Sequence, residues 1–510
     1  MARWKDWLQR GGLETMALLI GPMLLFGPPL LRGQALFWGT PLLQFTPWRH
    51  FAFEVLAGGD LPLWNPGLGM GAPLIANYQL AFFYPPSWIL ALIDIAWGQT
   101  LLVMLHLMLA AVGMERLARK VGISRQGAVL AGMAFSMSGY LVARASFLSI
   151  IWAAAWLPWL LWAVEVLLAR LHPSRVSNRK LIGGVILLAV VLAMQWLSGH
   201  AQTSWYSSLL VAAWTIWRGR QLGGRRLSLQ LATAVGLAVV LALLVAAIQL
   251  LPTGIYLAAS QRAGAVDRGL AMAYSFWPWR LIELATPNLF GSPGAGNYWG
   301  YAAHWEDALY MGMLPVLMAA GALFWPSERA RRWRWFFVPL IGLTFLLALG
   351  ENTPVFPFLY EHVPTFSLFQ APTRWNVFLV FGFAFLAGLG YDGWAPPQGR
   401  WLYWIRLATA GAGVIGLAAW LGSRLLGSVE ATFVPALAAS GAMLFLVGIL
   451  SLTRRKPLGF RWRLAMYALV ILDLILATAT LNPWQELALQ QGNASLPQRV
   501  DSEHRLYMPL

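Results

Sequence analysis

The sequence of 510 residues contains no cysteine and few charged residues. The absence of cysteine excludes disulfide bonds, thiolate metal ligands and a cysteine nucleophile. Charged residues make up only 11% of the chain, whereas an average soluble domain has about 25%. Hydrophobic residues make up 59%. This composition indicates a protein that lies largely within a lipid bilayer.

The sequence also lacks an internal repeat, which argues against a transporter built from inverted repeats. No spacing of His, Asp and Glu is typical of a metal site, so no metal ligand or cofactor is predicted. The scattered acids on the outer side still leave a divalent cation as an open alternative. The net charge of +16 would suit nucleic acid, but the basic residues stand in short clusters between apolar segments. Nucleic-acid binding is therefore not expected.

Thirteen apolar segments predict membrane-spanning helices, which need about 20 residues each. The first segment is too long for the core of a signal peptide and is interpreted as a retained span. The thirteen predicted spans are 13–31, 99–117, 126–142, 146–168, 181–198, 203–217, 230–252, 307–325, 335–350, 374–393, 403–426, 432–453 and 463–480.

The distribution of basic residues predicts the orientation of these spans. With the N-terminus in the cytoplasm, 26 of the 36 Lys and Arg fall on the cytoplasmic side and 10 fall outside, as the positive-inside rule requires. An odd number of spans then places the C-terminus outside. We expect residues 1–480 to form one all-α transmembrane domain, followed by a short extracytoplasmic tail at 481–510.

Three of the predicted outer connections are long, namely 32–98, 253–306 and 351–373. Long connections between spans commonly carry function, whereas the predicted cytoplasmic connections are short and basic. The long connections contain the acids Glu54, Asp60, Asp267, Glu283, Glu306, Glu351 and Glu361. Chemistry is therefore expected on the outer face.

The stretch GGDLPLWNPGLGMGAPLIANYQLAFFYPPSW, residues 58–88, is apolar and aromatic but broken by Pro and Gly. Irregular backbone of this kind cannot face lipid, because its N–H and C=O groups would lack partners. The preceding segment 46–58 has apolar residues at helical spacing, with Arg49, His50 and Glu54 on its other faces, and predicts an interfacial helix. The first loop is expected to cover the mouth of the bundle; the alternative is an aromatic anchor without chemistry.

Several motifs spread over nearly the whole chain carry a family resemblance. They are GDLPLWNPGLGMGAPLIANYQLAFFYPP (59–86), LSGHAQTSWY (197–206), QLLP (249–252), LATPNLFG (284–291), YWGYAAHWEDALYMGMLP (298–315) and VPTFSLFQAPTRW (363–375). As a set they resemble the YfhO-like family of bacterial polytopic membrane proteins, in the GT-C class of glycosyltransferases. The resemblance implies an enzyme of the bacterial inner membrane with a lateral lipid groove. It would move a sugar from a polyprenyl-phosphate carrier to an acceptor on the outer face.

Two features depart from the family's pattern. The family usually has an acid soon after the first span, and GT-C enzymes generally use such an acid as the base that activates the acceptor hydroxyl. Here the matching position is Thr40. Many relatives also continue past the last span into a large domain, whereas this chain ends with EHRLYMPL. The alternative interpretation is therefore a non-catalytic GT-C subunit that binds lipid or a membrane-protein partner.

Two acids are the candidates for the catalytic base. Asp60 lies between glycines and a proline, where the alternative is an ordinary solvated turn aspartate. Glu306 falls in the family motif HWEDALYMG. Together with Asp307 it opens a helix, where negative charge is favourable without any catalytic role.

Seven further residues are candidates for binding the substrate. Arg374 begins a span at the outer face, and its forked guanidinium suits a lipid phosphate; the alternative is an arginine that reaches up to the headgroups. The other six are His200, Gln202, Arg280, His304, Trp64 and Asn65. Inside the last span, Asp473 must be neutral, paired or facing a polar cavity, because an isolated charge there is costly.

Overall fold

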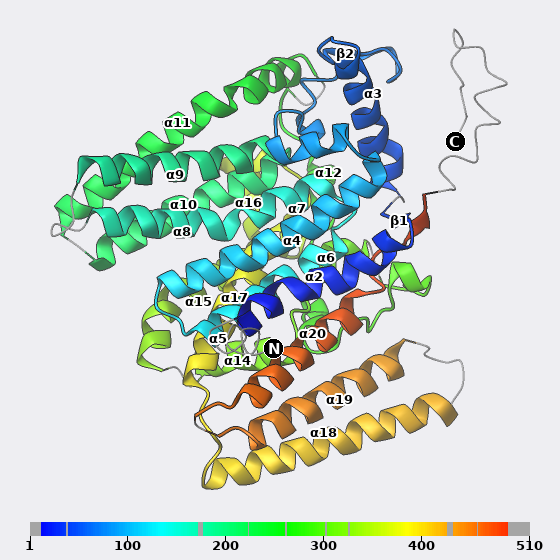
Figure 1. The fold of residues 1–510 in the computed structure, drawn as a ribbon, viewed down its shortest axis with the longest axis vertical. Coiled ribbons are helices and arrows are strands. Elements are labelled where there is room, and N and C mark those ends of the chain that lie inside the picture. Colours follow the sequence, from blue (N-terminus) through cyan, green and yellow to red (C-terminus); the bar gives the residue numbers. More distant parts are fainter. Residues whose placement is uncertain are drawn as a thin grey trace, which may run out of the picture.

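The computed structural model describes residues 12–36, 39–171, 177–222, 224–260, 263–300, 303–324, 327–425, 432–455 and 457–487. The chain is all-α, and each of the thirteen predicted spans coincides with a helix or a pair of consecutive helices (Figure 1). In chain order these are α2 (Leu13–Leu31), α4 (Ile95–Lys120), α5 and α6 (Arg125–Ser136, Gly139–Ala143), α7 and α8 (Leu148–Ala155, Leu157–Arg170), α9 (Asn178–Leu197), α10 (Ala201–Leu222), α11 (Arg225–Ala258), α14 (Met313–Phe324), α15 (Glu328–Ala348), α17 (Asn376–Gly393), α18 (Arg400–Leu425), α19 (Phe433–Leu452) and α20 (Phe460–Thr478).

Nine candidate spans in the described residues are long and apolar enough to cross a membrane by themselves. The four remaining predicted spans correspond to α10, α14, α15 and α20. Helix α14 is shorter, and the other three carry more polar or charged residues. These four helices nevertheless pack within the same bundle, which agrees with a polytopic membrane protein.

The three long connections, which we call the outer connections after their predicted side, are built from short helical and extended elements. The first contains β1 (Gln34–Ala35), η2 (Pro41–Phe45), α3 (Thr46–Ala57), β2 (Trp64–Asn65), β3 (Ala72–Pro73), η3 (Tyr78–Leu80) and η4 (Pro85–Ala91). The second contains α12 (Arg268–Met272), η6 (Pro278–Leu284), η7 (Pro293–Ala295) and α13 (His304–Asp307). The third contains η8 (Gly350–Asn352), α16 (Val355–His362), η9 (Phe366–Leu368) and η10 (Pro372–Trp375).

Helix α17 lies in the interior of the bundle, where it packs against α5, α14 and α15. Small residues allow the closest approach, because a Cβ on Gly127 of α5 would lie 2.5 Å from the carbonyl oxygen of Gly388 on α17. Small residues at crossing points are the usual means by which membrane helices gain van der Waals contact. This closely packed centre carries η10 and Arg374 at the start of α17.

A short antiparallel pairing joins two distant parts of the chain. Strand β1, which directly follows the first span, pairs with β4 (Gln485–Glu486), which follows the last helix. Paired strands must lie on the same side of a membrane. The number of crossings between them is therefore even, which agrees with the twelve predicted spans that lie between β1 and β4.

The first outer loop is packed over its second half and exposed at its hairpin. Tyr84 is fully buried, and its hydroxyl contacts His106 Nε2 at 2.7 Å and Trp156 Nε1 at 2.9 Å. Trp64 is instead 53% exposed, on the hairpin formed by β2 and β3. Figure 1 shows β1, β2 and α3 along the same side of the bundle.

The predicted polar faces of α3 are only partly correct. His50 and Glu54 are exposed and lie 3.6 Å apart. Arg49 is buried, with its guanidinium carbon 4.8 Å from the ring centroid of Trp152. Its long apolar stem allows this placement, which a helical pattern alone does not indicate.

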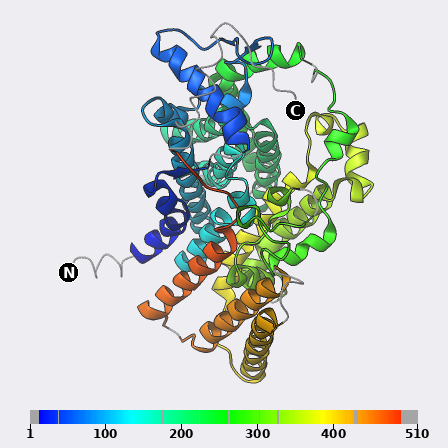
Figure 2. The ribbon, with the colours of Figure 1, turned by 90° about the vertical axis from the view of Figure 1, so that its right-hand side faces the viewer.

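Helices α18 and α19 form a peripheral hairpin. They lie together at one end of the molecule, beside α20, in both views (Figures 1 and 2). Only 17% of the apolar stretch of α18 that could span a membrane is buried within the molecule, whereas 94% of the corresponding stretch of α5 and α6 is buried. In a bilayer, this hairpin therefore meets lipid over most of its surface.

Candidate functional site

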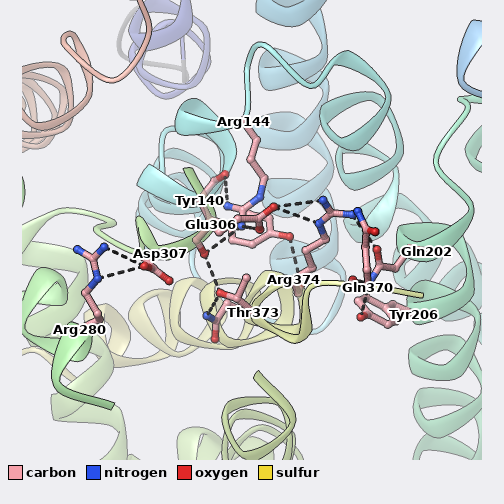
Figure 3. A network of polar contacts seen from close by, with 11 residues as sticks. Tyr140, Arg144, Gln202, Tyr206, Arg280, Glu306, Asp307, Gln370, Thr373 and Arg374 are labelled. Carbon is pink, nitrogen blue, oxygen red and sulfur yellow. Dashed lines mark hydrogen bonds and ion pairs between the residues drawn. The ribbon is translucent and has the colours of Figure 1, made fainter. Parts of the chain in front are cut away.

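Glu306 lies at the centre of a buried network of ion pairs (Figure 3). Its Oε2 accepts a hydrogen bond from Arg144 Nη2 at 2.8 Å, and its Oε1 accepts one from Arg374 Nη2 at 3.2 Å. The side chains of Arg144 and Glu306 are 0% and 3% exposed, whereas that of Arg374 is 15% exposed. Arg374 is therefore the member of this network that a ligand can reach most easily.

Arg144 is a member of the site that the sequence analysis did not identify. It directly follows α6, and its guanidinium carbon lies 3.7 Å from the ring centroid of Tyr140. Its Nη1 also donates to the Tyr140 carbonyl at 3.1 Å. The only available signal was its predicted place on the outer side, where basic residues are scarce.

Arg374 is held by a second polar partner besides Glu306. Its Nη1 donates to Gln202 Oε1 at 2.9 Å. Gln202 in turn donates from Nε2 to the Tyr206 hydroxyl at 2.8 Å and to the Gln370 carbonyl at 2.6 Å. Three predicted residues from distant motifs, Gln202, Glu306 and Arg374, are thus brought together (Figure 3).

Backbone contacts fix the segments that carry this network. The Thr373 hydroxyl donates to the Glu306 carbonyl at 2.7 Å, and the Tyr140 hydroxyl donates to the Arg374 carbonyl at 3.1 Å. Just before η10, Ala371 has a φ of 60°. A non-glycine residue in this region costs free energy, and such strain persists only where the surroundings hold it. The position of Arg374 is therefore imposed by its neighbours.

The network carries an excess of positive charge, because two guanidiniums face one carboxylate. Burial raises the pKa of the Glu306 carboxyl, but the charges of Arg374 and Arg144 lower it further, so the net pKa lies below its ordinary value. Glu306 therefore stays ionised at neutral pH. A buried unbalanced charge is unfavourable unless an opposite charge accompanies it, so the network suits an anionic ligand beside Arg374.

A second buried cluster adjoins the first through the residue that follows Glu306. Arg280 Nη2 lies 2.8 Å from Asp307 Oδ2, and Arg280 Nη1 lies 2.8 Å from Glu283 Oε1. The same guanidinium contacts the Tyr298 hydroxyl at 2.5 Å. The predicted residue Arg280 thus lies beside the site, but it binds acids of the protein.

The two acids of this cluster hold protons more tightly than usual. Burial raises the pKa of Glu283 to about 8, although the charge of Arg280 opposes the shift. Burial likewise raises the pKa of Asp307 to about 6, again against the charge of Arg280. Near neutral pH Asp307 is therefore mostly ionised and able to accept a proton, whereas Glu283 is mostly protonated.

The two predicted histidines are both buried near these clusters. His200 follows Gly199, which has a φ of +91°, a value that favours glycine. The Nδ1 atom of His200 accepts a hydrogen bond from the Thr203 N–H at 3.1 Å, so His200 caps α10. The two ring nitrogens of His304 have no hydrogen-bond partner in the described structure. Burial, and to a smaller extent the charges of Arg280 and Arg144, lower the pKa of His304 to about 3, so this ring is neutral.

The candidates from the first loop lie apart from this network. Asp60 is exposed after α3, and Thr40 directly precedes η2. Trp64 is on the β2–β3 hairpin, and Asn65 accepts the Gly67 N–H at 2.9 Å through Oδ1. Among the described residues, no recorded contact joins these four side chains to Glu306 or Arg374.

Within the described ranges no group of three or more His, Asp or Glu side chains is arranged to hold a metal ion. Asp473 has partners, as expected for an acid within a predicted span. Its Oδ1 accepts from the Tyr310 hydroxyl and its Oδ2 from the Met313 N–H, both at 2.7 Å.

Comparison of the sequence with models of protein families finds no match, and comparison with curated proteins also finds none. Comparison of the fold does find similar structures. ArnT from Cupriavidus metallidurans bound to undecaprenyl phosphate is 15% identical with a TM-score of 0.50, over 98% of this chain and 82% of that chain. Apo ArnT from the same organism is 13% identical with a TM-score of 0.49, over 94% of this chain and 77% of that one.

The oligosaccharyltransferase of Archaeoglobus fulgidus is also similar, at 11% identity and a TM-score of 0.45, over 96% of this chain and 58% of that chain. At these identities, similarity establishes the fold and not the reaction. Two observations therefore agree, namely a polytopic all-α bundle and its likeness to ArnT over nearly the whole chain. The chain is a multi-pass membrane protein with the fold of the GT-C glycosyltransferases.

Proposed function

We propose that this chain is a YfhO-like glycosyltransferase of the bacterial inner membrane. It transfers a sugar from a polyprenyl-phosphate carrier to an acceptor on the extracytoplasmic face. The observation that carries the proposal is the partly exposed Arg374 in a buried network with excess positive charge. ArnT, which shares the fold, has been crystallised with undecaprenyl phosphate, a lipid of the same chemical class as the proposed carrier.

Arg374 is the residue we assign to the carrier phosphate. Two of its nitrogens contact Glu306 and a third contacts Gln202, so the guanidinium is held in one orientation before a ligand arrives. Arginine binds phosphate through paired, charge-assisted hydrogen bonds. The phosphate would replace the neutral Gln202 amide as the partner of Nη1 and balance the excess charge.

Asp307 is the residue we assign as the base, in place of its neighbour Glu306. A general base works best when its pKa lies near the working pH. The pKa of Asp307 is raised to about 6, whereas that of Glu306 is held below its ordinary value by two guanidiniums. Asp307 would accept the proton of the acceptor hydroxyl. The oxygen of that hydroxyl would form a bond to the sugar as the bond between the sugar and the carrier phosphate breaks. Glu306 would act as a positioning residue for Arg374.

Sugar transfer by the full chain in proteoliposomes tests this assignment. Asp307→Asn should lower the rate about 100- to 10,000-fold, as expected for loss of a general base. Arg374→Ala should mainly weaken donor binding, by about 1.5–3 kcal/mol for a charge-assisted hydrogen bond. Asp60→Asn tests the first-loop base, and Glu361→Gln, an exposed acid paired with Arg268, is the matched control. Assays with EDTA and with Mg²⁺ test whether transfer needs a divalent cation.

The second candidate function is a non-catalytic subunit that binds lipid or a membrane-protein partner. It is favoured by Thr40, which stands where related enzymes have an acid, and by the ion pairs that occupy Glu306. If the wild-type chain binds a polyprenyl phosphate but transfers no sugar from any donor, this second function replaces the first. Transfer that Asp307→Asn leaves unchanged would instead show that another residue is the base.

A further inference from the structure

A cavity outside the network lies between the second outer connection and helices α19 and α20. Its surface is mostly apolar but has a polar part, after which we call it the polar cavity. It has a volume of about 250 Å³ and is lined by the loop 287–297, α19 and α20 with the residues just after it. Apart from the acid Asp473, its polar lining residues are amides and hydroxyls, among them Asn288, Asn297, Ser292 and Thr432. The Ser440 hydroxyl is buried without a hydrogen-bond partner in the described structure. Such a lining suits a ligand that has several hydroxyl groups.

The charge of this cavity excludes an anionic ligand. Among the described residues that line it, Asp473 is the only acid, and no Lys, Arg or His is present. A phosphate would meet a carboxyl group and no compensating cation, which is unfavourable in a partly buried site. The carrier phosphate proposed for Arg374 is therefore not the ligand of this cavity.

An apolar groove continues from the polar cavity between α18 and α19. It has a volume of about 760 Å³, and it shares Pro435 and Ala439 with the polar cavity. Along α19 it reaches from Pro435 to Phe445, about 15 Å at 1.5 Å per residue. That length is about half of a hydrocarbon core of roughly 30 Å, which is the depth of one leaflet.

The position of the cavity places its polar end at the face of the first loop. Thr480 lines the cavity and precedes β4, and β4 pairs with β1 at the start of the first loop. A ligand with its head in the cavity and a chain in the groove therefore has the orientation of a lipid in the leaflet on that face. The acyl chains of any bilayer lipid would fit the apolar groove. The polar groups of the cavity are not explained by acyl chains and indicate a lipid with a particular head.

The polar cavity also adjoins the acidic cluster that contains the proposed base. A small cavity of about 10 Å³ shares Asn288 and Tyr310 with it and is lined on the other side by Glu283 and His304. That volume corresponds to about one water molecule. Glu283 and Asp307 are both bound to Arg280, so a hydroxylated head in the polar cavity lies next to this cluster.

We propose that the polar cavity and the groove bind a lipid of the outer leaflet with an uncharged, hydroxyl-bearing head, and that this lipid is the acceptor. The acceptor role rests on the proposed transferase function, whereas the binding of the lipid does not. The head lies among the amides and hydroxyls near Asp473, and one acyl chain follows the α18–α19 groove.

Native mass spectrometry of the purified full chain tests the binding site. A monoglucosyl diacylglycerol should bind more tightly than a phosphatidylglycerol with the same acyl chains. Ala439→Trp fills the junction of cavity and groove and should weaken glycolipid binding at least about tenfold, equal to losing contact with two methylene groups. Leu444→Trp is the matched control, because Leu444 is 36% exposed on the same helix but lines neither cavity.

Two results would overturn the binding site, namely equal binding by wild type and Ala439→Trp, or tighter binding of phosphatidylglycerol. Because the Asp473 carboxyl is proposed to exclude anions, Asp473→Asn should reduce the preference for the glycolipid over phosphatidylglycerol. A transfer assay with the glycolipid as acceptor separates the two proposals. Binding without transfer to the glycolipid, or transfer that Ala439→Trp leaves unchanged, would contradict the acceptor role. Absence of transfer to every acceptor and from every donor would instead contradict the transferase function.

Discussion

At the scale of single residues, the site depends on how burial and charge act on neighbouring acids. Glu306 and Asp307 are adjacent in the chain, yet their side chains face different arginines. Two guanidiniums hold the pKa of Glu306 below its ordinary value, whereas burial beside one guanidinium raises that of Asp307 to about 6. Adjacent acids thus acquire different chemical roles from their surroundings.

Glu283→Gln should make stability less dependent on pH. The folded-state pKa of Glu283 is raised from 4.5 to about 8. The folded protein therefore holds this proton more tightly, and wild-type stability should fall as pH rises from about 4.5 to about 8, by at most about 1.4 kcal/mol per pH unit for one proton. Glutamine keeps an acceptor for Arg280 but does not titrate, so this loss should disappear.

Thermal unfolding in detergent, followed by tryptophan fluorescence between pH 5 and 8, checks this prediction. Asp307 contributes in the same direction up to about pH 6, and Glu306, with its lowered pKa, contributes in the opposite direction at acid pH. The variant should match wild type near pH 5 and be more stable near pH 8. Parallel curves for the two proteins would show that Glu283 does not hold a proton in the folded state.

At the scale of elements, the first outer loop divides into a packed part and an exposed part. Leu80, Phe82 and Tyr84 are buried against the bundle, whereas Met70 near the β2–β3 hairpin is 94% exposed. The aromatic composition indicated contact with the bundle or the interface. Only the packing shows that the anchor is a tyrosine bonded to His106 of α4 and to Trp156, which lies between α7 and α8.

Limited proteolysis from the outer face should cut the hairpin around Met70 before any site between 74 and 91. Tyr84→Phe removes both hydrogen bonds of the hydroxyl and leaves His106 and Trp156 with unpaired groups. Leaving a buried polar group unpaired costs about 1–3 kcal/mol, so cleavage within 74–91 should become faster in this variant. Trp64→Phe, on the exposed hairpin, is the control that should keep the wild-type rate within 74–91. Equal cleavage at both parts in wild type would contradict the packing.

At the scale of the whole molecule, the pairing of β1 with β4 places the two ends of the bundle on one side of the membrane. The bias of basic residues predicts that this side is extracytoplasmic. If exactly one of helices α10, α14, α15 and α20 did not cross, the number of crossings between the strands would be odd, so the pairing excludes that arrangement. The pairing and the charge bias are independent observations, and both agree with the predicted topology.

The absence of cysteine allows this topology to be tested with single cysteines. Met70→Cys should react with a membrane-impermeant maleimide added to intact cells, because the first loop is predicted outside. Glu328→Cys, exposed at the start of α15, should react only after the cells are opened. Labelling of the second variant in intact cells, or protection of the first, would show that the orientation is reversed.

The sequence by itself determined the fold class and several members of the site. Long apolar segments and scarce charge require a helical bundle, because a bilayer leaves no other way to satisfy the backbone. Glu306, Arg374 and Gln202 were selected from separate motifs, and the structure brings them into contact. The fold class follows from composition and local pattern, whereas the choice of these three residues followed from the family resemblance of their motifs.

The tertiary structure alone decided which charges meet and which acids are shifted. Arg144 reaches Glu306 across 162 positions of sequence, and Arg280 pairs with Asp307 across 27. Sequence spacing carries no signal for such contacts, because they form only when distant helix ends pack together. The pKa of an acid depends on its burial and on the charges around it. The identity of the proposed base, the excess positive charge and the lipid cavity therefore came from packing.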